Sequence, residues 1–286
     1  MRILLTGKNG QVGSALLETL PALGEVAAAD RTQLDLADPD SIRAAVRSVE
    51  PQVIVNAGAY TAVDQAEREE QLALSVNRDG PAILAEEAER VGALLVHFST
   101  DYVFDGEKPA PYAETDAPNP LNAYGRSKLA GEEAIRASGC RHLILRTSWV
   151  YAATGRNFLL TMLRLAREGR PLRVVDDQHG APTSSRMLAA AVTQAVSRVG
   201  GSEALGGTYH MSAAGSTTWC GFARAIVGAE VTPIRSSEYP TPARRPSNSL
   251  LDNAKLATQL SIRLAPWQEG LREVLDELRV RHPAVR

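Results

Sequence analysis

The chain has 286 residues, of which 44% are hydrophobic and 22% charged, and its formal net charge is −2. This balance is typical of a globular protein. The slight acidity argues against a nucleic-acid partner, because proteins that bind nucleic acid neutralise phosphates with a basic surface. No apolar run approaches the roughly 20 residues of a transmembrane helix, so no membrane partner is expected. Two cysteines, Cys140 and Cys220, are too few for a disulfide framework, and the residues before Gly7 lack a signal-peptide pattern. We therefore expect a cytoplasmic protein.

The first half of the chain alternates between short apolar runs and segments with helical spacing. In chain order we expect strand Arg2–Thr6, helix Gln11–Leu20, strand Glu25–Ala29, a helix from Asp38-Pro39 to about Val49, strand Val53–Val55, a helix containing Ala82–Arg90, strand Leu94–Phe98, helix Ala123–Ala137 and strand His142–Leu145. Such alternation with short connections predicts an α/β, doubly wound parallel-sheet Rossmann fold. Ligands of this fold bind beyond the carboxyl ends of the strands.

Glycines recur between the first strand and the first helix, in the segment Gly7-Lys8-Asn9-Gly10-Gln11-Val12-Gly13. They permit a tight turn and the close approach of a pyrophosphate, which rests on the amides of Gln11 and Val12 at the helix N-terminus. Gly13 lets the helix pack closely on the strand. The spacing is one residue wider than G-x-G-x-x-G, and no Gly-Lys-Ser/Thr of a Walker loop follows. A plain strand-to-helix turn is the alternative, but the flanking elements favour dinucleotide binding.

Asp30 follows about 20 residues later, where an acidic residue accepts hydrogen bonds from the adenosine ribose. Its carboxylate favours NADH, because it repels a 2′-phosphate. Arg31 comes next, and a guanidinium can clamp such a phosphate through two parallel hydrogen bonds. These opposite preferences nearly offset, so we expect NADPH to be moderately preferred and NADH to be usable as well.

Beyond about Tyr151 the alternation weakens, and prolines such as Pro171, Pro182 and Pro246 separate shorter elements. We interpret residues 1–150 as the dinucleotide-binding domain, with return segments from about 183–200. Residues 151–286 are then mainly a smaller C-terminal substrate-binding lobe.

Tyr124 and Lys128 lie four residues apart, on one face of an expected helix. An adjacent cation lowers the pKa of a phenol toward a range useful for proton transfer. Thr100 follows the strand Leu94–Phe98, where its hydroxyl can bind a substrate carbonyl oxygen. A surface Tyr/Lys pair and a polar cap are the alternatives, but their combination favours an active site.

Together, the glycine loop, the segment 99–106 (STDYVFDG) and the Tyr124/Lys128 pair resemble the extended short-chain dehydrogenases, in particular those that reduce dTDP-linked keto sugars. The resemblance covers nearly the whole chain and includes segments 56–64 (NAGAYTAVD), 146–151 (RTSWVY), 176–183 (DDQHGAPT) and 245–249 (RPSNS). It implies an oxidoreductase of dTDP-rhamnose biosynthesis, a monomer or homodimer, that reduces the C4 keto group of dTDP-4-dehydro-L-rhamnose with NAD(P)H.

Carried over to this chain, the resemblance implies a catalytic triad of Thr100, Tyr124 and Lys128, with Tyr124 as the proton donor and with Tyr124 and Lys128 also at the cofactor. Further residues would line the adenosine and phosphate part of the cofactor site: Asp35, Leu36, Ala57, Gly58, Ala59 and Tyr60. The substrate site would include Thr100, Asp101, Tyr102, Trp149, Asn157 and Arg245.

Some relatives place a glutamate early in the first helix for a magnesium-bridged dimer, whereas this chain has Ser14-Ala15 there. We therefore predict no metal site and expect magnesium to be dispensable. Two other functions stay open. One is an epimerase or dehydratase with tightly held NAD⁺, although no glutamate follows Asp101 as dehydratases require. The other is a non-catalytic NADP-binding regulatory subunit, against which the intact triad argues.

Overall fold

The computed structural model describes residues 1–199, 205–228 and 230–281. Its centre is a six-stranded sheet in the order β2-β1-β3-β4-β5-β10, in which every neighbouring pair is parallel. The strands are β1 (Arg2–Thr6), β2 (Glu25–Ala29), β3 (Val53–Asn56), β4 (Leu94–Thr100), β5 (His142–Thr147) and β10 (Gly207–His210). The order reverses between β1 and β3, which is where a doubly wound sheet opens a crevice for ligands. The predicted fold class is confirmed.

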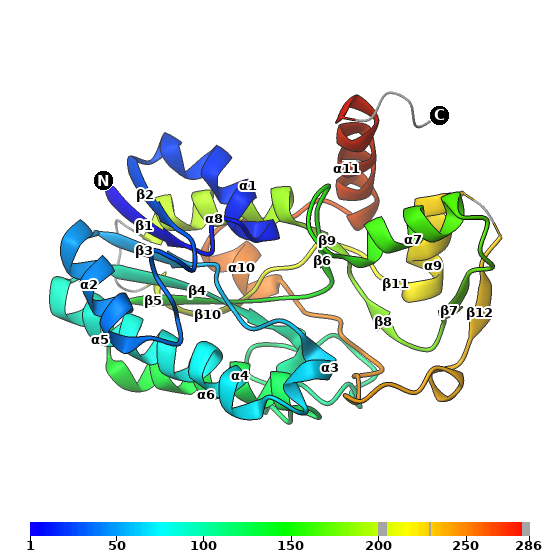
Figure 1. The fold of residues 1–286 in the computed structure, drawn as a ribbon, viewed down its shortest axis with the longest axis horizontal. Coiled ribbons are helices and arrows are strands. Elements are labelled where there is room, and N and C mark those ends of the chain that lie inside the picture. The colour runs from blue at the N-terminus through cyan, green and yellow to red at the C-terminus, as the bar shows by residue number, and fades with distance from the viewer. Residues whose placement is uncertain (200–204, 229, 282–286) are drawn as a thin grey trace.

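Helices cover both faces of this sheet (Figure 1). On one face lie α1 (Gln11–Thr19) and α8 (Ser185–Val199), and on the other α2 (Pro39–Val49), α5 (Gly80–Val91) and α6 (Ala123–Ser138). Successive strand residues point to opposite faces. Leu4 accordingly packs in the core with α2, α5 and α6, whereas Leu5 packs in the core with α1 and α8.

Local sequence explains why these helices begin where they do. Asp38 is the N-cap of α2, and its Oδ1 accepts hydrogen bonds from the backbone nitrogens of Asp40 (3.0 Å) and Ser41 (3.3 Å). Pro39 occupies the first helical position, where its missing N–H costs nothing. Shorter elements connect the main ones: η1 (Leu20–Ala22), α3 (Val63–Ala66), α4 (Glu70–Leu74), the π-helical turn η2 (Ser75–Asp79) and η3 (Asp101–Val103).

A second lobe has its own apolar core, which includes Phe222 and Trp267. Its helices are α7 (Phe158–Arg167), α9 (Trp219–Val227) and α11 (Trp267–Arg281), which lie beside one end of the main sheet (Figure 1). Three two-stranded pairs complete it: β6 (Val150–Tyr151) with β9 (Thr183–Ser184), β7 (Arg173–Val175) with β12 (Thr232–Ile234), and β8 (His179–Gly180) with β11 (Thr217–Thr218). The short helix η5 (Ser236–Glu238) follows β12.

The return to the main domain is longer than the expected 183–200. Beyond α8, strand β10 pairs with β5, with Gly207 opposite Leu143. The helix α10 (Ala254–Gln259) also returns, because Leu256 packs in the core of the α1/α8 face. Strands that pair across so many intervening residues leave no pattern in the local sequence, so the sequence did not indicate that β10 joins β5. Within the described ranges, no helix has the length and apolarity to cross a membrane.

Candidate active site

The glycine loop closes onto the start of α1 at the carboxyl end of β1. Gly7 adopts a left-handed conformation (φ 69°), and a Cβ atom there would lie 2.6 Å from the backbone nitrogen of Gly58. Only glycine fits this turn. Gly10 is the N-cap of α1, and no side chain among the described residues caps the helix. The N–H groups of its first turn, beginning at Gln11 and Val12, are therefore available to an anion. This arrangement fits the pyrophosphate of a dinucleotide.

Other residues expected along the cofactor lie around the loop. Gly13 is buried against the Gly7 carbonyl, with no space for a side chain. A Cβ atom at Gly58 would lie 2.8 Å from Cδ1 of Leu36, so Leu36 closes this side of the loop. The residues that follow β3 lie at the same edge of the sheet and are partly buried or exposed: Ala57, Ala59 and Tyr60. Their contact with a cofactor stays a prediction.

Charged side chains gather at the end of β2, where the adenosine is expected. Lys8 Nζ lies 3.2 Å from Asp30 Oδ2. Hydrogen bonds from Thr32 and Lys8 hold the pKa of Asp30 at about 2. The Arg31 side chain is exposed, and its Nε lies 3.2 Å from Asp35 Oδ2. Lys8 thus neutralises Asp30. This contact was not predicted from the sequence, and the position of Lys8 next to Gly7 was the one feature of the sequence that could have indicated it.

Helix α6 brings Tyr124 to the end of β4. The helix starts after Asn122, whose Oδ1 accepts a hydrogen bond from the backbone nitrogen of Gly125 (2.8 Å). Thr100, the last residue of β4, is buried, and Tyr124 is partly exposed. Burial raises the pKa of Tyr124, and the interaction with the Thr100 side chain opposes that rise. The phenol of Tyr124 is therefore protonated at neutral pH, as a proton donor must be.

Lys128 lies one turn further along α6 and is only 2% exposed. Its Nζ donates a hydrogen bond to the carbonyl oxygen of Phe98 (2.6 Å) and lies 3.1 Å from Nε2 of His97. Burial lowers the pKa of Lys128 to about 8, and the negative charge of Glu132 opposes this shift. We expected Lys128 to lower the pKa of Tyr124. That role stays a prediction: the Lys128 nitrogen is directed at β4, and burial is the largest influence on the pKa of the phenol.

Asp101 and Tyr102 directly follow Thr100 but have different surroundings. Asp101 is buried; its Oδ1 accepts a hydrogen bond from Thr100 Oγ1 (3.1 Å), and its Oδ2 has no partner among the described residues. Burial raises the pKa of Asp101 to about 7. The ring of Tyr102 meets Tyr124 edge to face, with ring centroids 5.8 Å apart. Burial raises the pKa of Tyr102 as well. Tyr102 thus borders the expected proton donor, whereas Asp101 is enclosed.

A buried charge network, which no motif in the sequence indicated, ties α6 to the sheet. Glu132 accepts hydrogen bonds from Arg146 Nε (2.8 Å) and Nη2 (2.7 Å), and also from the Ser99 hydroxyl. Glu132 is 0% and Arg146 3% exposed. Removing one partner of such a pair costs about 3–5 kcal/mol, because the other charge stays buried and unpaired. The network therefore holds α6, and with it Tyr124, in place on β4 and β5.

Trp149 stands at the edge between the sheet and the second lobe. It has a positive φ of 50°, which is unusual for a bulky residue. Its ring stacks on Trp219 of α9, with centroids 3.6 Å apart and planes 9° from parallel. The opposite neighbour is Gly180, where a Cβ atom would lie 2.6 Å from Cζ2 of Trp149. Trp149, the predicted sugar contact, is thus held in a slot formed by Trp219 and Gly180. The sequence did not indicate the role of Trp219.

Asn157, expected at the substrate, has a structural contact on every side of its amide. Its Oδ1 caps α7 by accepting a hydrogen bond from the Leu160 nitrogen (2.9 Å). Its Nδ2 donates to the Ala152 carbonyl (2.9 Å) and to Oε1 of Gln11 (2.8 Å). Asn157 thereby joins the second lobe to the glycine loop. Direct binding of substrate stays a prediction.

Arg245, also expected at the substrate, crosses from the second lobe to the main domain. Its two terminal nitrogens donate to the two carboxylate oxygens of Asp64, at 2.9 and 2.8 Å. Arg245 also lines a cavity of about 450 Å³ that α7 and α9 border, together with Phe158, Trp219 and Tyr239. Trp219, which stacks on Trp149, and Arg245 therefore both line this cavity.

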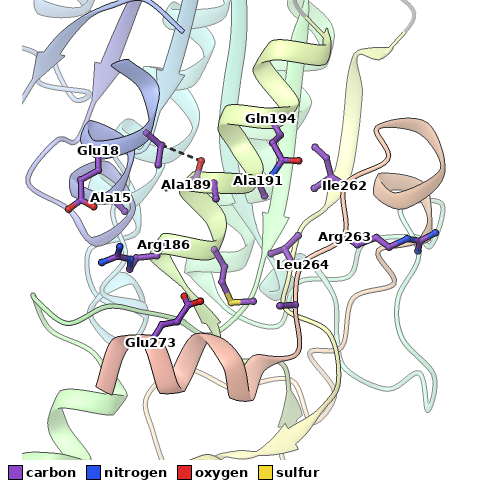
Figure 2. Close-up of a pocket in the computed structure, with 14 residues that line it drawn as sticks. Ala15, Glu18, Arg186, Ala189, Ala191, Gln194, Ile262, Arg263, Leu264 and Glu273 are labelled. Carbon is purple, nitrogen blue, oxygen red and sulfur yellow. Dashed lines mark hydrogen bonds between the residues drawn. The ribbon is translucent and has the colours of Figure 1, made fainter. Parts of the chain in front are cut away.

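A second cavity, of about 350 Å³, lies elsewhere (Figure 2). Residues of α1, α8 and α11 line it, and Glu18, Arg186 and Glu273 approach it from these three helices. None of the predicted site residues does. Among residues 1–199, 205–228 and 230–281, no group of three or more His, Cys, Asp or Glu side chains could hold a metal ion.

Comparisons with known proteins agree over nearly the full chain. Residues 1–280 match the family model described as the RmlD substrate binding domain. The dTDP-4-dehydrorhamnose reductase of Burkholderia thailandensis is 46% identical, with 94% of this chain and 96% of the relative covered. The enzyme of that name from Escherichia coli strain K12 is 43% identical, with 97% and 98% covered.

Solved structures show the same likeness. A crystal structure of dTDP-4-dehydrorhamnose reductase from Bacillus anthracis, in complex with NADP, has a TM-score of 0.90 at 36% identity, covering 96% of this chain and 99% of that one. A reductase of the same name from Clostridium acetobutylicum has a TM-score of 0.92 at 38% identity, covering 98% and 100%.

Proposed function

The chain belongs to the RmlD substrate binding domain family, and from that premise we propose that it reduces the C4 keto group of dTDP-4-dehydro-L-rhamnose to give dTDP-L-rhamnose. It is an NAD(P)H-dependent oxidoreductase, as its relatives named dTDP-4-dehydrorhamnose reductase indicate. The observation that carries the proposal is that Thr100 ends β4 at the carboxyl edge of the sheet, where the ring of Tyr124 on α6 contacts that of Tyr102, and that the same edge holds the glycine loop at the start of α1.

When bound, NADPH supplies a hydride for the C4 carbon of the sugar. Tyr124 donates its phenolic proton to the carbonyl oxygen, and the Thr100 hydroxyl donates a hydrogen bond that orients the same oxygen. The phenolate that remains is stabilised by the positive charge of Lys128 and takes up a proton from solvent. This role for Lys128 does not need a hydrogen bond to Tyr124 in the resting protein. It needs a charged ammonium in the same buried region.

The substrate would extend from Thr100 to the second lobe. We assign the partly exposed rings of Trp149 and Tyr102 to the sugar. The cavity of about 450 Å³ offers aromatic walls, Phe158 and Trp219, for the nucleotide base. Arg245 lines the same cavity, where a guanidinium suits a diphosphate.

The proposal is tested by the oxidation of NADPH with purified chain and dTDP-4-dehydro-L-rhamnose, with the UDP-linked 4-keto sugar in parallel. We expect turnover of the dTDP compound and formation of dTDP-L-rhamnose. Turnover of the UDP compound alone would contradict the proposed substrate. If NADPH is not oxidised with either compound, the proposed reductase activity is wrong.

Replacement of Tyr124 by Phe tests the proton donor. We expect the variant to fold and to lose turnover by about 10²–10⁴-fold, the usual contribution of general acid catalysis. Tyr209→Phe is the matched control, because that buried phenol donates to the Leu205 carbonyl (2.8 Å) away from the crevice. If Tyr124→Phe keeps more than about half of the rate while hydride transfer limits turnover, Tyr124 is not the donor.

A further inference from the structure

A row of polar side chains crosses three neighbouring strands beneath Lys128. Thr6 of β1 is opposite Asn56 of β3, and Asn56 is opposite His97 of β4. All three are 1% exposed. Leu4, Ile54 and Leu95, two residues earlier on these strands, pack in the core with α6. Because side chains alternate with a period of two, the polar row faces α6 as well.

Short contacts connect this row to Lys128. Thr6 Oγ1 donates a hydrogen bond to Asn56 Oδ1 (2.6 Å), and Asn56 Nδ2 lies 3.0 Å from His97 Nδ1. The other ring nitrogen, Nε2, lies 3.1 Å from Lys128 Nζ, which in turn donates to the Phe98 carbonyl (2.6 Å). Both nitrogens of His97 are thus engaged, and the ring has Lys128 on one side and Asn56 on the other.

The contacts of His97 limit which nitrogen carries its proton. Burial, and secondly the charge of Lys128, lower the pKa of His97 well below its usual value, so the ring is neutral. A neutral imidazole has one donor nitrogen and one acceptor nitrogen. An ammonium can only donate, so a charged Lys128 requires Nε2 to be the acceptor and Nδ1 to carry the proton. A neutral amine can accept, and then Nε2 carries the proton.

Asn56 can serve either arrangement. With Nδ2 toward His97, as in the structure, the amide donates to Nδ1, which matches a neutral Lys128. A half-turn of the amide places its oxygen toward Nδ1 and its nitrogen toward the Thr6 hydroxyl, which can also accept. That arrangement matches a charged Lys128. In both states the two ring nitrogens of His97 are hydrogen-bonded. In the second state the Thr6 hydroxyl accepts from the Asn56 amide and no longer has Asn56 Oδ1 as the acceptor for its own proton.

We propose that His97 is a positioning residue for Lys128, and that its tautomer, together with the orientation of the Asn56 amide, reverses when Lys128 gains or loses its proton. The groups that face His97 are uncharged on β3 and β1, and Lys128 is the charged group on α6. Glu132, also on α6, is paired with Arg146 and keeps its charge, since Arg146 helps to hold its pKa low against burial. Among the groups that the structure describes around His97, the proton on Lys128 is therefore the change to which the ring responds.

This coupling deepens the proposed function, on which it rests for the role of Lys128. A charged Lys128 stabilises the Tyr124 phenolate, and His97 is the acceptor that keeps that charge in a buried site. Lys128 has a pKa of about 8, whereas the pKa of Tyr124 is raised, so Lys128 titrates first. The basic limb of the pH profile then reports mainly the loss of the proton from Lys128.

Nitrogen NMR of the ligand-free protein tests the coupling without any activity. The chain has 5 histidines, which allows selective ¹⁵N labelling of the imidazole rings. We expect the His97 proton to move from Nδ1 to Nε2 between about pH 6 and about pH 10, with no doubly protonated ring. Lys128→Met should abolish the change. A single tautomer across that range in the wild type would overturn the proposal, and it would leave the reductase assignment untouched.

Variants of His97 provide the second measurement, the apparent pKa of the basic limb of kcat/KM. His97→Phe removes the acceptor, and because a hydrogen bond to a charged group is strong, we expect this pKa to fall by about one unit or more. In His97→Gln, the glutamine amide oxygen can accept a hydrogen bond from Lys128, so this pKa should return most of the way to the wild-type value. His210→Phe is the control, since His210 is equally buried (0% exposed) on β10 without a contact to Lys128. An unchanged or raised pKa in His97→Phe would contradict an acceptor role.

Discussion

Gly180→Ala tests the slot that holds Trp149. The added Cβ atom would lie 2.6 Å from Cζ2 of the Trp149 ring, whereas carbon atoms pack favourably at about 3.5–4.0 Å. The ring would therefore have to move by about 1 Å. It has little freedom to do so, because its other face stacks on Trp219 at 3.6 Å and Trp219 packs against Phe158, with centroids 4.6 Å apart.

Overpacking of this kind costs about 1–3 kcal/mol. We expect Gly180→Ala to lower the free energy of unfolding by that amount, as measured from denaturation curves followed by tryptophan fluorescence. Because Trp149 is assigned to the sugar, KM for the keto sugar should rise by about tenfold, which corresponds to about 1.4 kcal/mol of lost binding.

A double-mutant cycle separates this clash from a general effect on the strand that contains Gly180. Trp149→Phe shortens the ring and removes the atoms that the new methyl group would meet. In that background Gly180→Ala should cost at least about 1 kcal/mol less than in the wild-type chain. If the two costs are equal, or if Gly180→Ala changes neither stability nor KM, the ring is not confined between Gly180 and Trp219.

Two further predictions concern charge. Burial raises the pKa of Asp101 to about 7, against about 3.9 in an unfolded chain, so between these values the folded chain retains a proton that the unfolded chain loses. The free energy of unfolding should then fall by up to about 4 kcal/mol as pH rises from about 4 to about 7, and it should level off above that pH. This fall should be absent in Asp101→Asn. If the free energy of unfolding depends on pH in the same way in both proteins over this range, the prediction is wrong. Arg31→Ala should lower the NADPH-to-NADH ratio of kcat/KM by roughly tenfold, because the exposed guanidinium, which pairs with Asp35, suits a 2′-phosphate. An unchanged ratio would show that Arg31 does not contact this phosphate.

The local pattern of the sequence was enough for the strands and helices of the main domain in the first 150 residues that depend on near neighbours. The strand at Arg2–Thr6 and the start of α2 after Asp38 depend on neighbours within a few residues, and the structure confirms both. The glycine loop could be recognised for the same reason, since Gly7 and Gly10 lie within one turn between a strand and a helix. Tyr124 and Lys128 were found from their spacing of four on one helix.

Tertiary structure alone decided what these side chains contact. The spacing of Tyr124 and Lys128 placed both on one face of a helix, but only the packing shows that the Lys128 nitrogen contacts His97 and the Phe98 carbonyl. The slot around Trp149 joins residues far apart in the chain, as does the pairing of Arg245 with Asp64. Periodicity records which face of an element is apolar, whereas such contacts depend on the register between strands and on the packing of helices over them. The chemistry of this site is therefore determined by long-range packing, which adjacent residues do not encode.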